Sequence, residues 1–392
     1  MLTLPDDVKK ILNTLNSEGH AAYVVGGCVR DSLMGIIPKD WDITTSALPH
    51  EIKTLFKPTI DTGIEHGTVT VVISRRNYEV TTFRIDGQYT DGRRPDTVKF
   101  TGKLEADLSR RDFTMNAIAY SPLTGITDPF CGAIDIKNKI IKCVNEPVLR
   151  FSEDALRMMR AIRFAAQLSF NIEEHTHKAI YQIAERLNLV SMERIRDELT
   201  KILCSDNPAM VKILADTGLW QYIIRGKNIK CNLNKAYLIV NCTKTPAMIY
   251  ALLETDKAFM RHLKFDNQTI NETALYCEWI GKDITNSRYR IKKVLNKMGP
   301  DKFKKLIALK IIAEPDNSAH FNNVLNLARD IIKSGECYTL NNLAVKGGDL
   351  IDTGIPPGKE IGRALGDLLD MVMAEPELND RDVLLGLLSA KG

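Results

Sequence analysis

The hydrophobic pattern changes once along this 392-residue chain, and that change constrains the fold more than any other feature. Before about residue 145, short β-branched runs alternate with helical stretches. From Ser152 onward, Leu, Ile, Ala and Met recur at spacings of three and four residues. Such spacing is typical of amphipathic helices. The pattern therefore predicts an α+β protein, in which an N-terminal α/β head precedes an all-α remainder.

Turn residues and β-branched runs locate the elements of the head. We expect strands over 21–25 and 39–44, a helical stretch from about Arg30, a helix over 49–57, a hairpin of 67–74 and 78–84 around Arg75–Asn77, and a helix over 104–118. The helical remainder is expected to break near 169–171, 205–208, 224–235, 299–300 and 356–358.

Length and composition set the broad class. A chain of 392 residues is long enough for two to four domains, and 44% hydrophobic with 26% charged residues is ordinary for a soluble protein. The apolar runs are short and broken by charge, so we expect no transmembrane helix, and the N-terminus lacks a signal-peptide pattern. Eight scattered cysteines without a CxxC pair favour reduced thiols and a cytoplasmic location. The net charge of +4 only weakly indicates an anionic partner.

The segment Asp40-Trp41-Asp42 carries the first chemical signal. Residues i and i+2 of a strand point to the same face, so both carboxylates would lie side by side. Paired carboxylates suit Mg²⁺ that substrate phosphates also hold. Glu79, on a strand expected beside this one, would add a third carboxylate. The alternative interpretation is a pair of surface acids at a strand end.

Gly26-Gly27 follows an expected strand and precedes a helix start. Such a loop lets backbone N–H groups approach a phosphate, and Arg30 would add positive charge. A plain tight turn is the alternative. The chain has neither GxxxxGK[ST] nor GxGxxG, which argues against a P-loop and against a dinucleotide-binding fold.

Seven segments resemble the class II tRNA nucleotidyltransferases, which are the CCA-adding enzymes, and their bacterial poly(A) polymerase relatives. They are GGCVRD (26–31), DWD (40–42), YEVTTFR (78–84), RRDFTMNA (110–117), DPFCGAIDI (128–136), EDALRMMRAIRF (153–164) and ERIRDEL (193–199). They occur in the family's order and spacing over roughly 20–205, and beyond about 210 the resemblance is diffuse. Cys28 departs slightly from the small residue common in the family.

The resemblance implies a polymerase β-like nucleotidyltransferase head, followed by an all-α neck, body and tail. The corresponding ranges are 1–137, 138–205, 206–315 and 316–392. The implied reaction adds C, C and A to the 3′ end of tRNA from CTP and ATP, without a template and with release of pyrophosphate. Asp40 and Asp42 would bind two Mg²⁺ ions, with Glu79 as a further catalytic carboxylate.

Asp154 and Arg157 are expected to select the nucleotide. Placed at i and i+3 of a helix, their side chains would lie next to each other. A carboxylate accepts a hydrogen bond from an amino group, and a guanidinium donates one to a ring nitrogen. Cytosine and adenine both present that pair of groups, whereas uracil and guanine present the reverse. The alternative is an intrahelical surface salt bridge.

The resemblance also implies further nucleotide-binding residues. Arg160 and Arg163 resemble triphosphate ligands, Arg111 is a similar candidate, and Asp112 and Asn116 would hold the ribose, with helix packing and capping as the alternative. They join Gly27, Arg30, Asp154 and Arg157. The family's loop at 85–97, here with Asp86, Asp91, Arg93 and Arg94, is associated with switching from CTP to ATP, which argues against an enzyme that adds only C and C.

The segment 288–310 contains nine Lys or Arg against one Asp, a candidate patch for the RNA backbone, with a solvated helix face as the alternative. The expected partners are tRNA, ATP and CTP, without DNA or a membrane, and a homodimer is left open. The rival functions are a poly(A) polymerase or A-adding enzyme of the same family, a non-catalytic RNA-binding protein, and a small-molecule nucleotidyltransferase.

Overall fold

The computed structural model describes residues 2–89 and 95–389, and the chain divides into two compact units. The first unit comprises residues 1–229 with 258–265, and the second comprises 230–257 with 266–392. The first unit therefore contains both the sheet and the first helices of the all-α part. The predicted α+β class is confirmed.

A mixed seven-stranded sheet forms the framework of the first unit, in the order β3-β4-β5-β2-β1-β8-β9. Its strands are β1 (Ala22–Val25), β2 (Ile43–Thr45), β3 (Thr59–Gly63), β4 (Thr68–Ile73), β5 (Arg76–Thr82), β8 (Ala119–Ser121) and β9 (Gly125–Thr127). Strands β2 and β5 run parallel, whereas β1–β2, β4–β5 and β1–β8 run antiparallel. Two small sheets pair β6 (Arg84–Asp86) with β7 (Val98–Phe100), and β10 (Ile140–Ile141) with β11 (Asn171–Ile172).

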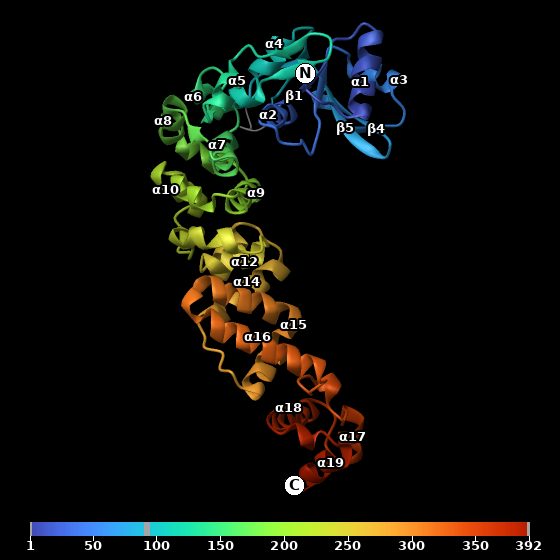
Figure 1. Ribbon diagram of the computed structural model, residues 1–392, viewed down its shortest axis with the longest axis vertical. Helices are drawn as coiled ribbons and strands as arrows, with labels where there is room; N and C mark the ends of the chain where they lie inside the picture. Colours follow the sequence, from blue (N-terminus) through green and yellow to red (C-terminus); the bar gives the residue numbers. More distant parts are fainter. Residues whose placement is uncertain (1, 90–94, 390–392) are drawn as a thin grey trace. The chain divides into compact units, whose positions relative to one another are not determined.

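Amphipathic helices cover the sheet. In α1 (Asp6–Ser17), the buried residues Val8, Ile11, Leu12 and Leu15 follow the helical period and form one apolar face. Helix α1 lies beside α3 (Pro49–Leu55) in Figure 1, and the two contact β1 and β4 respectively. The other α-helices before Pro147 are α2 (Gly27–Leu33), α4 (Leu104–Ser109) and α5 (Gly132–Lys137).

The remaining helices of the first unit follow Pro147. They are α6 (Pro147–Glu153), α7 (Leu156–Leu168), α8 (Glu174–Gln182), α9 (Met192–Leu203), α10 (Ile213–Asp216), α11 (Leu219–Ile224) and α13 (Lys257–His262), whose first residue belongs to the second unit. Helices α6, α7 and α8 lie together (green in Figure 1). Because α7 packs against both α6 and α9, most of its residues are buried.

Several sequence predictions fail at element boundaries. The strand expected over 39–44 begins only at Ile43, so the two aspartates precede it. The hairpin is confirmed, but its turn is Ser74–Arg75, both with positive φ, and Arg76 already belongs to β5. The helix expected over 104–118 ends at Ser109 and is followed by the short 3₁₀ helix η2 (Thr114–Asn116) and by β8.

The second unit is helical. Its α-helices are α12 (Pro246–Leu252), α14 (Asn267–Ile280), α15 (Arg288–Ala313), α16 (Ser318–Lys333), α17 (Gly347–Asp352), α18 (Lys359–Ala374) and α19 (Arg381–Ser389). The predicted break at 299–300 is confirmed as a kink inside α15, where Gly299 has φ 77° and Pro300 follows. Proline cannot supply the backbone donor that a straight helix needs there.

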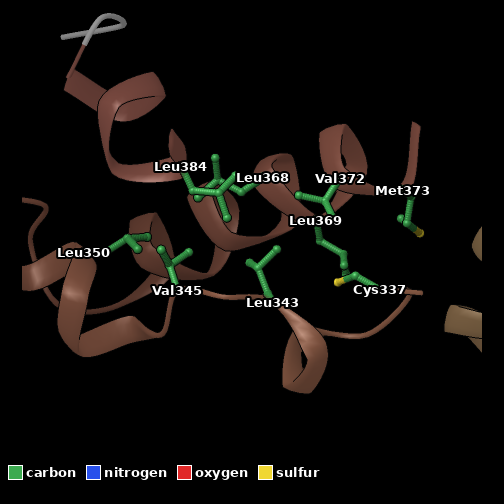
Figure 2. Packing of buried hydrophobic residues seen from close by; sticks show 9 residues of the cluster. All are labelled: Cys337, Leu343, Val345, Leu350, Leu368, Leu369, Val372, Met373 and Leu384. Atoms are coloured by element: carbon green, nitrogen blue, oxygen red, sulfur yellow. The ribbon is translucent and has the colours of Figure 1, made fainter. Parts of the chain in front are cut away.

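The C-terminal part of the second unit has its own apolar core. Figure 2 shows Leu343, Val345 and Leu350 directed toward Leu368 and Leu369 of α18. Cys337, Val372, Met373 and Leu384 complete this cluster of nine buried residues. The segment after the Pro-Pro-Gly turn therefore packs against the preceding loop and α17.

The expectations about membranes and cysteines can be compared with the described residues. No helix within 2–89 and 95–389 combines the length and the apolar character needed to span a bilayer. All eight cysteines lie in described residues, and none forms a disulfide.

Candidate active site

Three carboxylates gather at the start of β2. Ile43 pairs with Val80 in the parallel ladder of β2 and β5, so Asp42 and Glu79 stand one step earlier on neighbouring strands. Burial raises the pKa of Asp42, and the charge of Asp40 raises it further. Burial likewise raises the pKa of Glu79, and the charges of Asp42 and Asp40 add to it. The three side chains are therefore close enough to repel one another, although each keeps exposed surface.

This donor set fits a cation that is only partly held by the protein. Among the described residues, no group of three or more His, Cys, Asp or Glu side chains is arranged to hold a metal ion unaided. Magnesium usually binds through one or two carboxylates together with substrate phosphates and water. Asp40 and Asp42 fit that mode, and a bound cation would relieve their repulsion.

Gly26 allows an arginine to approach the carboxylates. Its φ of 80° and ψ of −129° lie where L-residues are strained, and a Cβ atom there would stand 2.9 Å from Nη1 of Arg111. Arg111 lowers the pKa of Asp42 by its charge and pairs with Asp107 at 3.6 Å. The glycine that the geometry requires is thus Gly26, whereas Gly27 opens α2 with room for a Cβ.

A network of hydrogen bonds joins Asp112 and Asn116 to two arginines. Asp112 accepts from Nε and Nη2 of Arg160 at 2.9 and 2.6 Å, and from Asn116 at 3.1 Å. Asn116 in turn accepts from Nη1 of Arg30 at 2.8 Å. Burial raises the pKa of Asp112, but the charge and hydrogen bonds of Arg160 outweigh it and lower the pKa to about 2. The carboxylate is therefore ionised at neutral pH.

Arg163 lies at the far end of this network. Its guanidinium pairs with the buried Glu198 of α9, with Nε 3.2 Å from Oε2 and Nη1 donating to Oε1 at 3.3 Å. The structure thus brings the side chains of Arg30, Arg160 and Arg163 to one side of α7, around Phe164.

The expected fork of Asp154 and Arg157 is wrong in its local geometry. Asp154 does not lie on a helix: it stands between α6 and α7, with φ −144° and ψ 103°. Both of its carboxylate oxygens accept hydrogen bonds from Arg194 of α9, at 3.2 and 2.7 Å. Arg157 instead pairs with Glu153 and donates to the carbonyl oxygens of Arg150 and Arg110.

Sequence reasoning missed three residues that hold the candidates in place. Arg194 and Glu198 lie within the quoted segment ERIRDEL but were given no role. Asp107 is fully buried and accepts hydrogen bonds from Thr44 and Arg110. Its signal was a carboxylate on the apolar side of a short helix, which implies a buried partner.

The loop at 85–97 is described only in part. Asp91, Arg93 and Arg94 lie outside the described residues. Asp86 closes β6, where it pairs with Arg84 at 3.0 Å and accepts from the Tyr89 hydroxyl at 2.7 Å. The loop's first residues are thus anchored by an ion pair.

Most cations of the basic segment 288–310 are engaged within the second unit. Lys293 pairs with Asp370 at 2.5 Å, Lys297 with Glu278 at 2.8 Å, and Lys305 with Glu272. Others in this segment with intramolecular partners are Arg288, Lys292 and Lys310. An RNA backbone would therefore compete with existing partners for much of this segment.

Comparison with known proteins places this arrangement in a family. Family models match the chain over 22–142 (Poly A polymerase head domain), 169–229 (Probable RNA and SrmB-binding site of polymerase A) and 245–388 (tRNA nucleotidyltransferase domain 2). The CCA-adding enzyme of Levilactobacillus brevis is 37% identical, over 97% of this chain and 98% of its own length. This chain belongs to the family of CCA-adding enzymes.

Two further relatives agree with that membership. The CCA-adding enzyme of Geobacillus stearothermophilus is 44% identical over 67% of each chain. The crystal structure of the Bacillus stearothermophilus CCA-adding enzyme in complex with CTP superposes with a TM-score of 0.85 and 32% identity, covering 99% of this chain and 98% of that one. The chain is thus an enzyme of a metal-dependent nucleotidyltransferase family.

Proposed function

We propose that this enzyme adds C, C and A in turn to the 3′ end of tRNA, using CTP and ATP without a nucleic-acid template. The observation that carries the proposal is the carboxylate cluster of Asp40, Asp42 and Glu79 beside Arg111. Relatives that align with nearly the whole chain are named CCA-adding enzymes, and one of them is solved with CTP. These likenesses support the substrate assignment.

In the proposed reaction the 3′ hydroxyl of the tRNA loses its proton to water, and its oxygen forms a bond to the α-phosphorus. The bond from that phosphorus to the bridging oxygen of the β-phosphate breaks, and pyrophosphate leaves. Asp40 and Asp42 would hold Mg²⁺, with Glu79 adjacent. When bound, Mg²⁺ ions promote ionisation of the 3′ hydroxyl and neutralise charge on the leaving group. No side chain needs to act as a nucleophile.

The arginine network would orient the nucleotide. Arg30, Arg160 and Arg163 are positioned to meet the triphosphate charge, and guanidinium groups match phosphate oxygens in geometry. Asp112 and Asn116 would accept and donate hydrogen bonds at the ribose, and Arg160 keeps Asp112 ionised. These residues act by positioning and charge, which is the main protein contribution in phosphoryl transfer.

Base selection would depend on Asp154 and Arg157 as preorganised, separate groups. Arg194 fixes the Asp154 carboxylate, and Glu153 with two backbone carbonyls fixes the Arg157 guanidinium. The amino group of cytosine or adenine would donate to Asp154, while Arg157 would donate to the adjacent ring nitrogen. Uracil and guanine would place a carbonyl against the carboxylate, at the cost of an unpaired polar group.

We further propose the division into head (1–137), neck (138–205), body (206–315) and tail (316–392), with tRNA bound along the helical part. Phosphate contacts give affinity without base reading, which suits an enzyme that serves many tRNAs. A cytoplasmic location is supported by eight cysteines without a disulfide, and fractionation tests it. Light scattering on the purified enzyme tests whether it forms a homodimer.

Primer extension on tRNA transcripts that end before CCA, after C and after CC tests the proposal. Each is incubated with Mg²⁺ and CTP, ATP, UTP or GTP singly, then with CTP and ATP together. Asp42→Asn removes a proposed metal ligand, and Asp61→Asn is the matched control, because Asp61 forms an exposed surface pair with Lys53. We expect three additions and a stop, no use of UTP or GTP, and activity only in the control.

Other products would assign a rival function. Extension of only the CC-ended tRNA would indicate an A-adding enzyme, and an unlimited A tail would indicate a poly(A) polymerase. Activity without tRNA binding would favour a small-molecule nucleotidyltransferase. Wild-type activity in Asp42→Asn would remove the metal assignment.

A further inference from the structure

Three arginines of the candidate site lie over the ring of one phenylalanine, Phe164. Phe164 of α7 is 6% exposed, and its ring centroid lies 4.3 Å from the guanidinium carbon of Arg163. The guanidinium carbons of Arg30 and Arg160 lie 5.2 and 5.4 Å from the same centroid. All three distances fall within the range of cation–π attraction. The ring therefore joins a cation of α2 to two cations of α7.

The three cations repel each other in this place. Burial lowers the pKa of Arg163, and the charges of Arg160 and Arg30 lower it further, against the opposing charge of Glu198. Each guanidinium is also held on another edge by a carboxylate, in the pairs Arg30–Asp31 (2.7 Å), Arg160–Asp112 (2.6 Å) and Arg163–Glu198 (3.2 Å). The carboxylates fix the outer edges, and the ring lies at the centre.

A ring at the centre differs from a further carboxylate in its effect on an anionic ligand. The ring's quadrupole attracts cations without neutralising them. It also occupies none of the N–H donors that phosphate oxygens need, whereas a carboxylate would compete for them. An aromatic centre thus keeps the guanidinium groups together without taking further N–H donors from them.

A second buried ring lies beside Phe164. Phe113 packs edge-on against it, with centroids 5.8 Å apart and an interplanar angle of 85°. Phe113 is fully buried, and no arginine of the described residues lies over its ring. The two rings are therefore similar in burial and different in their contact with cations.

We propose that Phe164 is a positioning residue for the triphosphate of the incoming nucleotide, because its ring holds Arg30, Arg160 and Arg163 together. This inference rests on the proposed function, which takes the three arginines as triphosphate ligands. Phe164 touches no phosphate itself. It sets the spacing of the cations that do.

The test compares Phe164→Leu with Phe113→Leu in the full-length enzyme. Inorganic tripolyphosphate is titrated by calorimetry without tRNA, and KM for CTP, KM for tRNA and the melting temperature are measured in parallel. We expect Phe164→Leu to raise the Kd of tripolyphosphate and the KM for CTP about tenfold, or 1.4 kcal/mol at 25 °C, with KM for tRNA unchanged. Phe113→Leu should lower the melting temperature by a similar amount. It should leave the Kd of tripolyphosphate and the KM for CTP within about twofold of the wild-type values. Phe164→Tyr should restore binding.

Two outcomes would overturn the inference. The first is tripolyphosphate binding by Phe164→Leu equal to that of the wild type. The second is a loss of tripolyphosphate binding in Phe113→Leu as large as in Phe164→Leu, which would indicate an effect of core packing in general. If Phe164→Leu fails to fold, pentafluorophenylalanine at position 164 keeps the packing and removes the ring's attraction for cations, and unchanged tripolyphosphate binding there would reject the role. Should the wild type add nothing to tRNA, the proposed function fails, while the calorimetry still reports on the arginine cluster.

Discussion

Adding one methyl group at Gly26 tests how the site is built. The backbone there has φ 80° and ψ −129°, and the new Cβ would lie 2.9 Å from Nη1 of Arg111. Backbone in such a region costs an L-residue about 1–3 kcal/mol. We therefore expect Gly26→Ala to lower the free energy of unfolding by that amount, measured by guanidinium denaturation.

The same substitution should impair catalysis through Arg111. The guanidinium must move away from the methyl group, and its position beside Asp42 and Asp107 is then lost. A hydrogen bond to a charged group contributes about 1.5–3 kcal/mol. If Arg111 meets nucleotide charge, kcat/KM for CTP should fall about 10- to 150-fold.

A second glycine separates strain from displacement. Gly19 has φ 83°, but a Cβ there would meet no atom within 4 Å. Gly19→Ala should therefore lower stability by about 1–2 kcal/mol without changing kcat/KM. In the background of Arg111→Ala, Gly26→Ala should cost no further activity, because its target is already absent. Full activity of Gly26→Ala, or an equal additional loss in the Arg111→Ala background, would refute this reasoning.

Three further outcomes are expected. Arg194→Gln should lower kcat/KM for CTP and ATP about tenfold and increase UTP incorporation, because Asp154 loses both hydrogen bonds from Arg194 that orient it. Primer extension measures both effects, and UTP rejection equal to that of the wild type would contradict the prediction. Burial raises the pKa of Glu336, but hydrogen bonds from Arg288 and Lys292 outweigh it and lower the pKa to about 2. The ionised Glu336 carboxylate therefore stabilises the fold fully above about pH 4.5, and this contribution is lost as the pH falls toward 2. In Glu336→Gln the free energy of unfolding should fall less steeply between about pH 4.5 and pH 2 than in the wild type. An unchanged pH dependence would show that these ion pairs do not stabilise the fold. Lys310→Met should lower stability by about 1–3 kcal/mol, because the buried ammonium donates to the carbonyls of Ile280 and Lys282 at the end of α14; thermal unfolding within error of the wild type would count against that contact.

The sequence predicted elements well where side-chain periodicity and turn residues agree. Strand β1 was expected because an apolar run over 21–25 precedes Gly26-Gly27. The hairpin of β4 and β5 was expected because β-branched runs lie on both sides of a polar turn. The expected turn, Arg75–Asn77, begins one residue and ends two residues after the observed turn at Ser74–Arg75. Arg76 and Asn77 are polar because they lie exposed at the end of β5, and composition alone does not distinguish an exposed strand end from a loop.

The helix expected over 104–118 failed for a tertiary reason. Phe113, Met115, Ala117 and Ile118 are all buried, which is compatible with a helix when the sequence is read alone. In the structure the N–H of Thr114 donates to the carbonyl of Lys142, a partner far along the chain. That contact satisfies the N–H of Thr114, so this donor needs no α-helical partner, and only the short 3₁₀ turn η2 forms there.

Asp154 and Arg157, the residues proposed to select the nucleotide, show the limit of spacing most clearly. The rule that i and i+3 are neighbours holds only inside a helix, and Asp154 stands at the junction where α6 ends and α7 has not begun. There its Oδ1 accepts from the N–H of Leu156, and the carboxylate turns toward Arg194, forty residues later. Arg194 is thus the partner of Asp154, whereas Arg157 pairs with Glu153, a carboxylate that it shares with Arg150. In the proposed function, Asp154 and Arg157, each already paired within the protein, select a base edge by hydrogen-bond polarity. That arrangement favours discrimination between amino and carbonyl groups, which is the difference between cytosine or adenine and uracil or guanine.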